Sequence, residues 1–110
     1  MKPRSGHVVV VLVTCPTMAV AKRLAGRLVQ RRQAACVNIV PGLTSVFRWQ
    51  GKIERAPEIL LVIKTARKRF AELSKTIRAL HPYDVPEIIA WPVTAGHPPY
   101  LSWVIANTWA

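Results

Sequence analysis

The chain has 110 residues, enough for one domain whose hydrophobic core needs no disulfide or metal to hold it together. Sixteen Lys and Arg against five Asp and Glu give a formal net charge of +11. No apolar run approaches the ~20 residues of a membrane-spanning helix, so we expect no membrane association. Cys15 and Cys36 show no CxxC or metal-type spacing and lie in apolar runs, which favours buried, reduced thiols over a disulfide scaffold.

The N-terminal third predicts a strand and then a helix. Residues 1–7 carry two basic side chains but no small-residue cleavage site, so we interpret them as the flexible tail of a cytoplasmic protein and not as a signal peptide. His7–Cys15 is a near-continuous apolar run, typical of a central strand covered on both faces. Thr17 can cap a helix over Met18–Arg32, whose apolar residues recur at helical spacing.

Ala34–Thr65 predicts one long antiparallel hairpin. Its outward leg is kinked at Pro41-Gly42, because Pro cannot donate to a sheet ladder and Gly tolerates a bulge, so the kink belongs at an edge or outside the main sheet. The chain then turns at Gln50-Gly51 and returns. Strands of roughly 14 residues reach about 45 Å, whereas a domain of this size is only some 30–35 Å across. We therefore expect the hairpin to project and to need a partner surface for Val46, Phe47 and Trp49.

The remaining segments continue the alternation of strands and helices. Helical spacing returns over Arg67–Leu80, and His81-Pro82 ends it because a residue before proline is pushed out of the helical region. Glu87–Val93 is typical of a fourth strand. Pro98-Pro99 can start a last helix, from Tyr100 to about Thr108, that is apolar on nearly all sides and so needs cover from more than one direction.

The order of elements is β-α-β-β-α-β followed by a C-terminal helix. This order predicts an α+β, ferredoxin-like sandwich with a long kinked hairpin, forming a single domain over residues 1–110. The projecting hairpin and the all-round apolar last helix both favour oligomerisation.

Signals of catalysis are scarce. The sequence has no GxSxG, P-loop, GxGxxG or HExxH motif. With three His and five acidic residues, the candidates for general acid–base chemistry are limited to Glu58, His81, Asp84 and Glu87. We predict that the chain is not an enzyme and that it has no catalytic residue and no cofactor.

The basic composition raises nucleic acid as a partner, because a common RNA-binding module shares this topology. That module stacks bases on aromatic residues of its first and third strands, and neither His7–Thr14 nor Glu58–Thr65 contains one. This disfavours nucleic acid. One alternative stays open: a basic polyanion-binding or RNA-binding module that uses the helical face, with Arg23, Arg27, Arg31 and Arg69.

Six peptide strings have no obvious chemical role: VTCP (13–16), AACVNI (34–39), GLTSVFRWQGKI (42–53), EILLVIKT (58–65), HPYDVPEI (81–88) and GHPPYLSWV (96–104). In this order and spacing they resemble the CutA family, the divalent-cation tolerance proteins, from about Val8 to Thr108. The resemblance implies a ferredoxin-like protomer in a tight homotrimer with interlocking hairpins, an assembly similar to the PII signalling proteins. It also implies a non-enzymatic role in tolerance of, or response to, divalent metal ions such as copper.

The resemblance also assigns residues to two places. The matching polar side chains are expected to line clefts between subunits, where a divalent cation or a small anion would bind: Glu58, Lys64, His81, Tyr83 and Glu87. The matching aromatic side chains and the hairpin's Phe47 are expected at the trimer interface: Phe47, Trp49, Tyr100 and Trp103. Lys64 ends an apolar run, so we expect its ammonium at the edge of the sheet, facing a carboxylate such as Glu87.

The pattern that binds copper in some bacterial members of the family is incomplete here. Those members use a Cys late in the first strand and two adjacent His before the Pro-Tyr pair. The matching positions in this chain are Val13 and Leu80-His81, and Cys15 is displaced by two residues. One imidazole and one displaced thiol make a poor ligand set for copper, so we predict no specific metal site. Gln50 also replaces an acidic residue that the family commonly has after Trp49.

Overall fold

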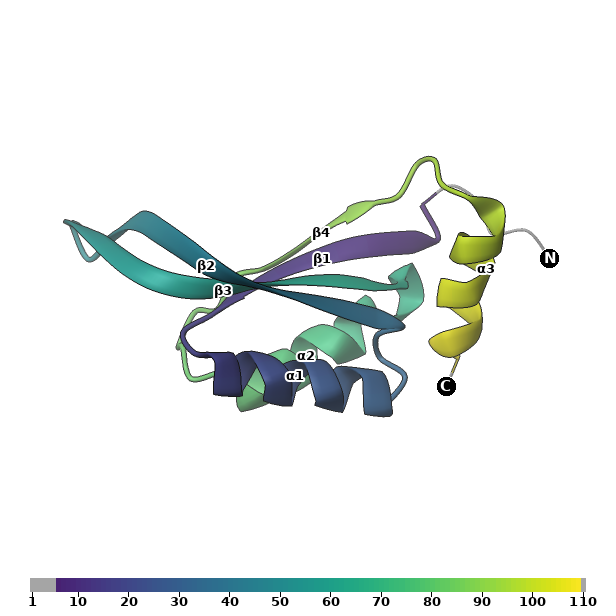
Figure 1. Cartoon of the computed structure of the whole chain (residues 1–110), viewed down its shortest axis with the longest axis horizontal. Helices are drawn as coiled ribbons and strands as arrows, with labels where there is room; N and C mark the ends of the chain where they lie inside the picture. The colour runs from purple at the N-terminus through teal and green to yellow at the C-terminus, as the bar shows by residue number, and fades with distance from the viewer. Residues whose placement is uncertain (1–5, 110) are drawn as a thin grey trace.

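The computed structural model describes residues 6–109, and its longest dimension follows the predicted hairpin (Figure 1). The predicted tail, residues 1–7, lies outside this range except for Gly6 and His7. The Gly6 amide donates to the Val93 carbonyl (3.2 Å), and the His7 carbonyl accepts from the Arg67 amide (2.7 Å). These two bonds join the start of the described chain to the segments that follow the fourth and third strands.

Four antiparallel strands form one sheet in the order β2-β3-β1-β4. The inner strands are β1 (Val8–Cys15) and β3 (Lys52–Ala66), and the edge strands are β2 (Cys36–Trp49) and β4 (Ile88–Pro92). The predicted ferredoxin-like α+β fold is confirmed. The fourth strand is slightly shorter than the predicted Glu87–Val93.

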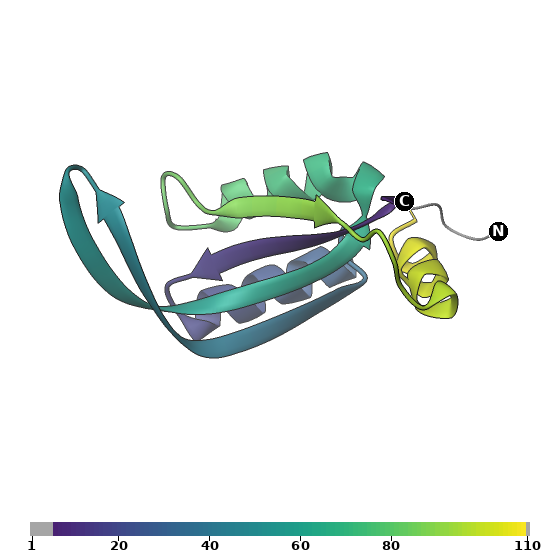
Figure 2. The ribbon, with the colours of Figure 1, turned by 90° about the horizontal axis from the view of Figure 1, so that it is seen from above.

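Two helices cover one face of this sheet, side by side, as both ribbon views show (Figures 1 and 2). The first, α1 (Met18–Gln30), starts as predicted at Thr17, whose Oγ1 accepts from the Val20 amide (3.2 Å). The second, α2 (Phe70–Leu80), follows a short 3-10 turn, η1 (Arg67–Arg69), so the predicted helix over 67–80 begins as a tighter turn.

The core lies between the sheet and these helices, because alternate strand residues and one stripe of each helix face each other there. The fully buried aliphatic side chains come from β1, β3, α1 and α2: Val11, Val13, Leu61, Ile63, Leu24, Leu28, Leu73 and Ile77. Burying a side chain of this size contributes about 1.5–3 kcal/mol, so this interface holds the two layers together. It leaves the other face of the sheet without helical cover.

The β2–β3 hairpin projects beyond the two layers, as predicted (Figure 2). The molecule measures 49 × 25 × 23 Å, so its long dimension is about twice either of the others. The kink is where expected: the register of β2 against β3 shifts between Val40 and Leu43, and Gly42 has a φ of +86° that favours glycine. Gln50 and Gly51 form the tip, both with positive φ, which is the geometry of a type I′ turn.

The last helix, α3 (Pro98–Asn107), packs across one end of the sheet against β1 and β3 (Figure 1). It begins at Pro98, two residues before the predicted Tyr100, so both residues of the proline pair lie in its first turn. Val104 is buried, whereas Tyr100 and Trp103 stack on each other with ring centroids 5.7 Å apart and remain 40% and 45% exposed. Among the described residues no helix is both long and apolar enough to cross a membrane.

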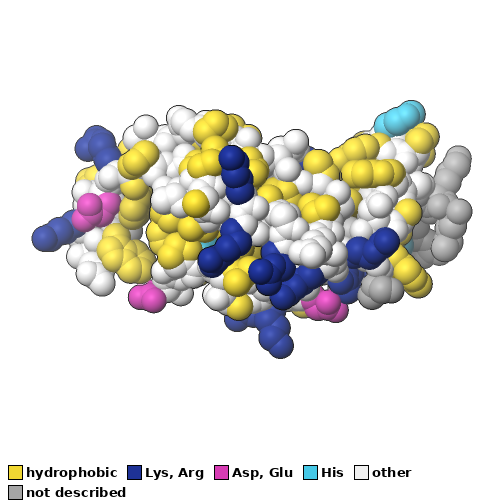
Figure 3. Space-filling model, turned by 60° about the horizontal axis from the view of Figure 1, so that its bottom comes forward, with side chains coloured by type: hydrophobic (Ala, Val, Ile, Leu, Met, Phe, Trp, Pro, Cys, Tyr) yellow, Lys and Arg dark blue, Asp and Glu magenta, His cyan; other side chains and the backbone are white. Residues whose placement is uncertain are grey.

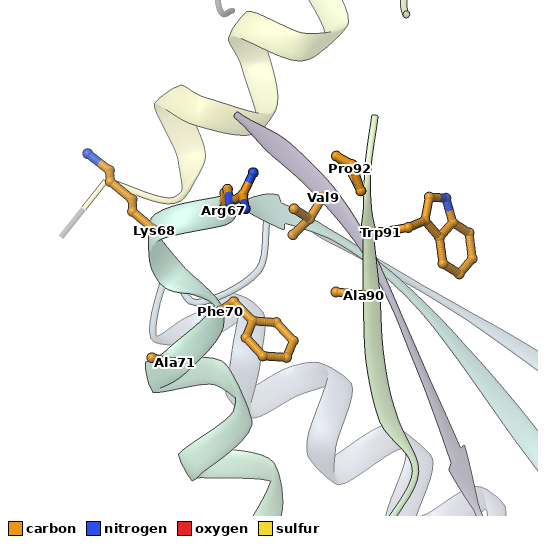
Figure 4. A pocket seen from close by; sticks show the side chains of 8 residues that line it. All are labelled: Val9, Arg67, Lys68, Phe70, Ala71, Ala90, Trp91 and Pro92. Atoms are coloured by element: carbon orange, nitrogen blue, oxygen red, sulfur yellow. The ribbon is translucent and has the colours of Figure 1, made fainter. Parts of the chain in front are cut away.

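The helix-free face of the sheet is also apolar. Leu12 lies between Val62 and Ile89 across the strands, and the alternation of side chains places all three on the face away from α1 and α2. Trp91, on the same face of β4, points away from α2 (Figure 4). Ile89 and Trp91 are 53% and 45% exposed, so this face presents large apolar side chains to its surroundings.

Candidate functional site

A cavity of about 780 Å³ lies between the outer half of the hairpin and the loop that follows α2. Its aromatic lining is Phe47, Trp49 and Tyr83. Four carboxylates also line it: Glu54, Glu58, Asp84 and Glu87. The chain has only five acidic residues, so all but Glu72 gather here, facing a single lining cation, Arg55.

His81 fixes the loop that closes one side of this cavity. Its Nε2 lies 2.8 Å from the Thr14 carbonyl, and its Nδ1 accepts from the Tyr83 amide at 3.1 Å. These two partners assign the neutral tautomer with the proton on Nε2. The imidazole is buried and its ring lies 4.7 Å from that of Tyr83. Both ring nitrogens therefore hold the loop to the end of β1, and neither is free to bind a metal.

Tyr83 and Glu58 form the polar centre of the cavity. The Tyr83 hydroxyl donates to Glu58 Oε2 (2.9 Å), and Glu58 is only 8% exposed. Burial, followed by the hydrogen bond to Glu58 and the negative charge of that carboxylate, raises the pKa of Tyr83 to about 12. At neutral pH the phenol therefore stays protonated and donates a hydrogen bond to Glu58. Within residues 6–109, Glu58 forms no ion pair.

Cys15 lies behind this pair in the core. Burial, and then the negative charge of Glu58, raises the pKa of its thiol to about 11. A thiol held in its protonated form is neither a nucleophile nor a ready metal ligand. The prediction of a buried thiol is confirmed for Cys15, while Cys36 is only half-buried, on edge strand β2.

The structure brings three of the five predicted cleft residues together. Glu58, Tyr83 and Glu87 line the cavity, and His81 supports it from behind. Two further lining residues, Glu54 and Arg55, were not predicted. The signal for them is the hairpin register, which pairs Phe47 with Glu54 and Val46 with Arg55 once the turn at Gln50-Gly51 is fixed.

Lys64 lies apart from this cavity. It is on β3, an inner strand and not the expected edge of the sheet, opposite Val10 and Cys36. Its Nζ donates to Asn38 Oδ1 on the neighbouring strand β2. An ion pair of Lys64 with Glu87 does not form within residues 6–109 of one protomer, and such a pair between protomers stays a prediction.

The residues of one protomer do not fit a copper ion. Among the described residues no three His, Cys, Asp or Glu side chains are grouped as metal ligands. The imidazole of His81 uses both nitrogens in hydrogen bonds, and the Cys15 thiol is protonated at neutral pH. Copper would need two or more imidazole or thiolate ligands.

A second cavity, of about 360 Å³, lies between α2 and the strands β1 and β4 (Figure 4). Val9, Phe70, Ala90 and Pro92 supply apolar walls, and Arg67 supplies a charge at its end. No carboxylate, thiol or imidazole of the described residues lines it. It therefore offers no metal ligand or acid–base pair and is a weaker candidate than the cavity beside Glu58.

The four predicted interface residues are all exposed on the protomer. Phe47 and Trp49 are 41% and 47% exposed near the tip of the hairpin, and Tyr100 and Trp103 lie on α3 at the other end of the molecule. Large aromatic side chains seldom stay exposed in such numbers on a monomer of this size. Burial of these four side chains at a trimer interface stays a prediction.

A four-stranded antiparallel sheet, two helices on one face and a projecting hairpin define a ferredoxin-like protein with an extended arm. The sequence matches the CutA1 divalent ion tolerance protein family over residues 9–107. The chain belongs to this family.

Relatives and solved structures agree with this assignment. The chain is 52% identical to the divalent-cation tolerance protein CutA of Thermus thermophilus, over 90% of this chain and 96% of that protein. A solved structure of Cut A1 from Thermus thermophilus gives a TM-score of 0.90 at 50% identity and covers 91% of this chain and 97% of that one. The structure of CutA from Xylella fastidiosa gives 0.91 at 43% identity, covering 93% and 98%.

Proposed function

We propose that this chain forms a cytoplasmic homotrimer that acts without catalysis in tolerance of, or response to, divalent metal ions, copper among them. In this proposal the protomers assemble through their hairpins, and the cavity beside Glu58 and Tyr83 becomes a small-ligand site between subunits, similar to the arrangement of PII-like proteins. The function rests on family membership, since the family and the Thermus relative both carry divalent-ion tolerance in their names.

The observation that carries the assembly is the projecting hairpin. The arm belongs to a molecule 49 Å long, and residues 6–109 of its own chain leave Val46, Phe47, Trp49 and Ile53 each more than 40% exposed. Covering such side chains contributes about 25 cal/mol per Å² of apolar area removed from water. A second copy of the same chain offers a matching arm, and closed rotational symmetry buries all of them alike.

The charge of the cavity favours a cation over a small anion as its ligand. Four carboxylates line it against one guanidinium, and the buried Glu58 carboxylate has only a phenol as its partner among the described residues. Buried carboxylates are stabilised by a cation. Because one protomer lacks a complete ligand set, we propose that the cation is held between protomers, with Glu58 contributing from each.

The test is a calorimetric titration of the purified protein with Mn²⁺, a divalent cation that suits carboxylate ligands. The proposal expects saturable binding that weakens at least about tenfold in Glu58→Gln. Glu72→Gln is the matched control, because it also removes one carboxylate but lies on α2, outside the cavity. Absence of saturable binding to the unmodified protein, or equal loss in both variants, would contradict the cation site.

A further inference from the structure

The positive charge of the chain lies mainly on the helical layer. Ten of its sixteen Lys and Arg residues are on α1, η1, α2 or the two residues after α1: Lys22, Arg23, Arg27, Arg31, Arg32, Arg67, Lys68, Arg69, Lys75 and Arg78. The same segments contain one acidic residue, Glu72. Figure 3, which brings this side forward, shows the basic side chains gathered along it.

Most of these cations have no partner within the described chain, although Lys68 Nζ lies 4.2 Å from the centroid of the Trp109 ring. Arg69 Nη1 pairs with Glu72 Oε2 at 3.0 Å, the single ion pair of residues 6–109. Arg23 donates to the Leu80 carbonyl (3.1 Å) at the C-terminal end of α2, so it also ties the two helices together. A surface made soluble by charge usually intersperses both signs, and one with a single sign repels itself. The positive charges of the helical layer therefore repel one another, and binding of an anionic partner would relieve this repulsion.

The arrangement of these side chains suits a row of phosphates. Arg23, Arg27 and Arg31 follow one another at a spacing of four residues, about 6 Å along α1. The antiparallel helix α2 adds Lys75 and Arg78 alongside. Seven of the ten cations are Arg, whose guanidinium binds phosphate oxygens with two parallel hydrogen bonds.

We propose that the helical layer binds the phosphate backbone of double-stranded nucleic acid without sequence specificity. The two helices lack the aromatic side chains on which single-stranded bases stack: α1 has none, and Phe70 of α2 packs against the core. Trp109, beside the layer, already has Lys68 over its ring. It also lacks an apolar edge for insertion into lipid, since Val29 is the one large apolar side chain on α1 or α2 that is more than 40% exposed.

This surface is separate from the proposed assembly face. The helices cover one side of the sheet, whereas the exposed apolar residues lie on its other side and on the hairpin. A trimer built through those residues leaves the helical layer outward. The open face of the sheet plays no part in this proposal. The helical layer is therefore a different surface from the first and third strands, on which an RNA-binding module of this topology stacks bases.

The experiment measures the fluorescence anisotropy of labelled 20-base-pair DNA and RNA duplexes with the full chain as salt is varied. If five side chains each neutralise one phosphate, the dissociation constant rises roughly 500-fold between about 50 mM and about 200 mM NaCl. The logarithm of the association constant then falls with the logarithm of the salt concentration with a slope of about −4.5. The two duplexes distinguish DNA from RNA as the source of the backbone. Absence of duplex binding at about 50 mM NaCl, or tighter binding of a single strand of the same length, would overturn the proposal.

Two matched variants locate the surface. Arg31→Gln/Arg78→Gln removes two charges from the helical layer, at side chains that form no hydrogen bond or ion pair within residues 6–109. Arg48→Gln/Lys52→Gln removes two charges from the hairpin. We expect the first variant to lose at least about tenfold in duplex affinity, with a salt slope of about −2.7, and the second to keep both. Equal losses would overturn the assignment, as would efficient competition by phosphatidylserine vesicles, which would make the partner a membrane.

Discussion

At the scale of single residues, two hydrogen-bond donors, His81 and Tyr83, hold the candidate site together. The His81 Nε2–H donates a hydrogen bond to the Thr14 carbonyl, and the Tyr83 hydroxyl donates one to Glu58. A third hydrogen bond links these two residues, because the Tyr83 amide donates to the His81 ring. This chain of bonds closes the loop over the cavity and leaves Glu58 as its buried negative charge.

His81→Ala should destabilise the fold by about 2 kcal/mol, because it leaves the Thr14 carbonyl and the Tyr83 amide without their partner. Urea unfolding followed by tryptophan fluorescence measures this loss. His97→Ala, at an exposed position whose side chain caps nothing, is the control and should change stability little. Because both His81 nitrogens are already hydrogen-bonded, the stoichiometry of Mn²⁺ binding should stay the same in His81→Ala, and a loss of binding would make His81 a ligand.

Cys15 should resist alkylation in the native protein. A pKa of about 11 instead of 9.0 lowers the thiolate fraction about 100-fold at neutral pH, and the side chain is fully buried as well. The Cys36→Ser variant isolates this thiol for reaction with iodoacetamide, followed by mass spectrometry. Labelling should require unfolding. Reaction at the rate of a free cysteine in the native state would show that the core around Glu58 opens readily.

Stability should fall as the pH rises from about 9 to about 12. The pKa of Cys15 is raised from 9.0 to about 11 and that of Tyr83 from 10.0 to about 12, so the folded chain keeps protons that the unfolded chain releases. The stabilisation is therefore complete below pH 9 and lost through this window. Urea unfolding at several pH values measures it, and Tyr83→Phe should flatten the upper part of the curve. A flat profile in both proteins would mean that neither group holds its proton through burial beside Glu58.

At the scale of elements, the hairpin is the feature that the sequence specifies most fully. Its length, the kink at Pro41-Gly42 and the turn at Gln50-Gly51 all follow from local chemistry: a residue without an amide proton, a residue without Cβ, and alternating apolar side chains. The end of α1 was not predictable in this way. Arg32 there adopts a φ of +57°, a conformation that usually signals glycine, so no stop was visible in the sequence.

Substitutions at the tip test the turn geometry. Gln50 has a φ of +50°, which asparagine tolerates better, so Gln50→Asn should stabilise the protein by about 0.5 kcal/mol. Gly51→Ala places a Cβ at a φ of +79° and should destabilise it by about 1 kcal/mol or more. Thermal unfolding compares the two. A stabilising Gly51→Ala would mean that the tip is not a type I′ turn.

The site was less predictable than the fold, for a physical reason. Glu58, Tyr83 and Glu87 could be named because their strings resemble a known family, but their meeting depends on how the hairpin and the loop after α2 approach each other. Glu54 and Arg55 show the same limit, since no local motif marks them and only the register of the hairpin places them beside Phe47 and Val46. Lys64 was misplaced because an apolar run that ends in lysine does not reveal whether its strand is inner or edge.

At the scale of the whole molecule, the fold separates three kinds of surface. Acidic residues gather at one cavity, basic residues gather on the helical layer, and large apolar side chains lie on the open sheet face, the hairpin and α3. The sequence shows only their totals, because residues far apart along the chain share each surface. We propose assembly through the apolar surface, binding of a cation at the acidic one and binding of a polyanion at the basic one.

The central claim is that the projecting hairpin builds a trimer, and native mass spectrometry at micromolar concentration tests it most directly. The account predicts a particle of about 37 kDa, three times the 12.3 kDa of one chain. Replacing Phe47 and Trp49 together by Ser should shift the population toward smaller species, since both side chains are exposed on the isolated protomer. A particle of 12.3 kDa from the unmodified chain would contradict the account.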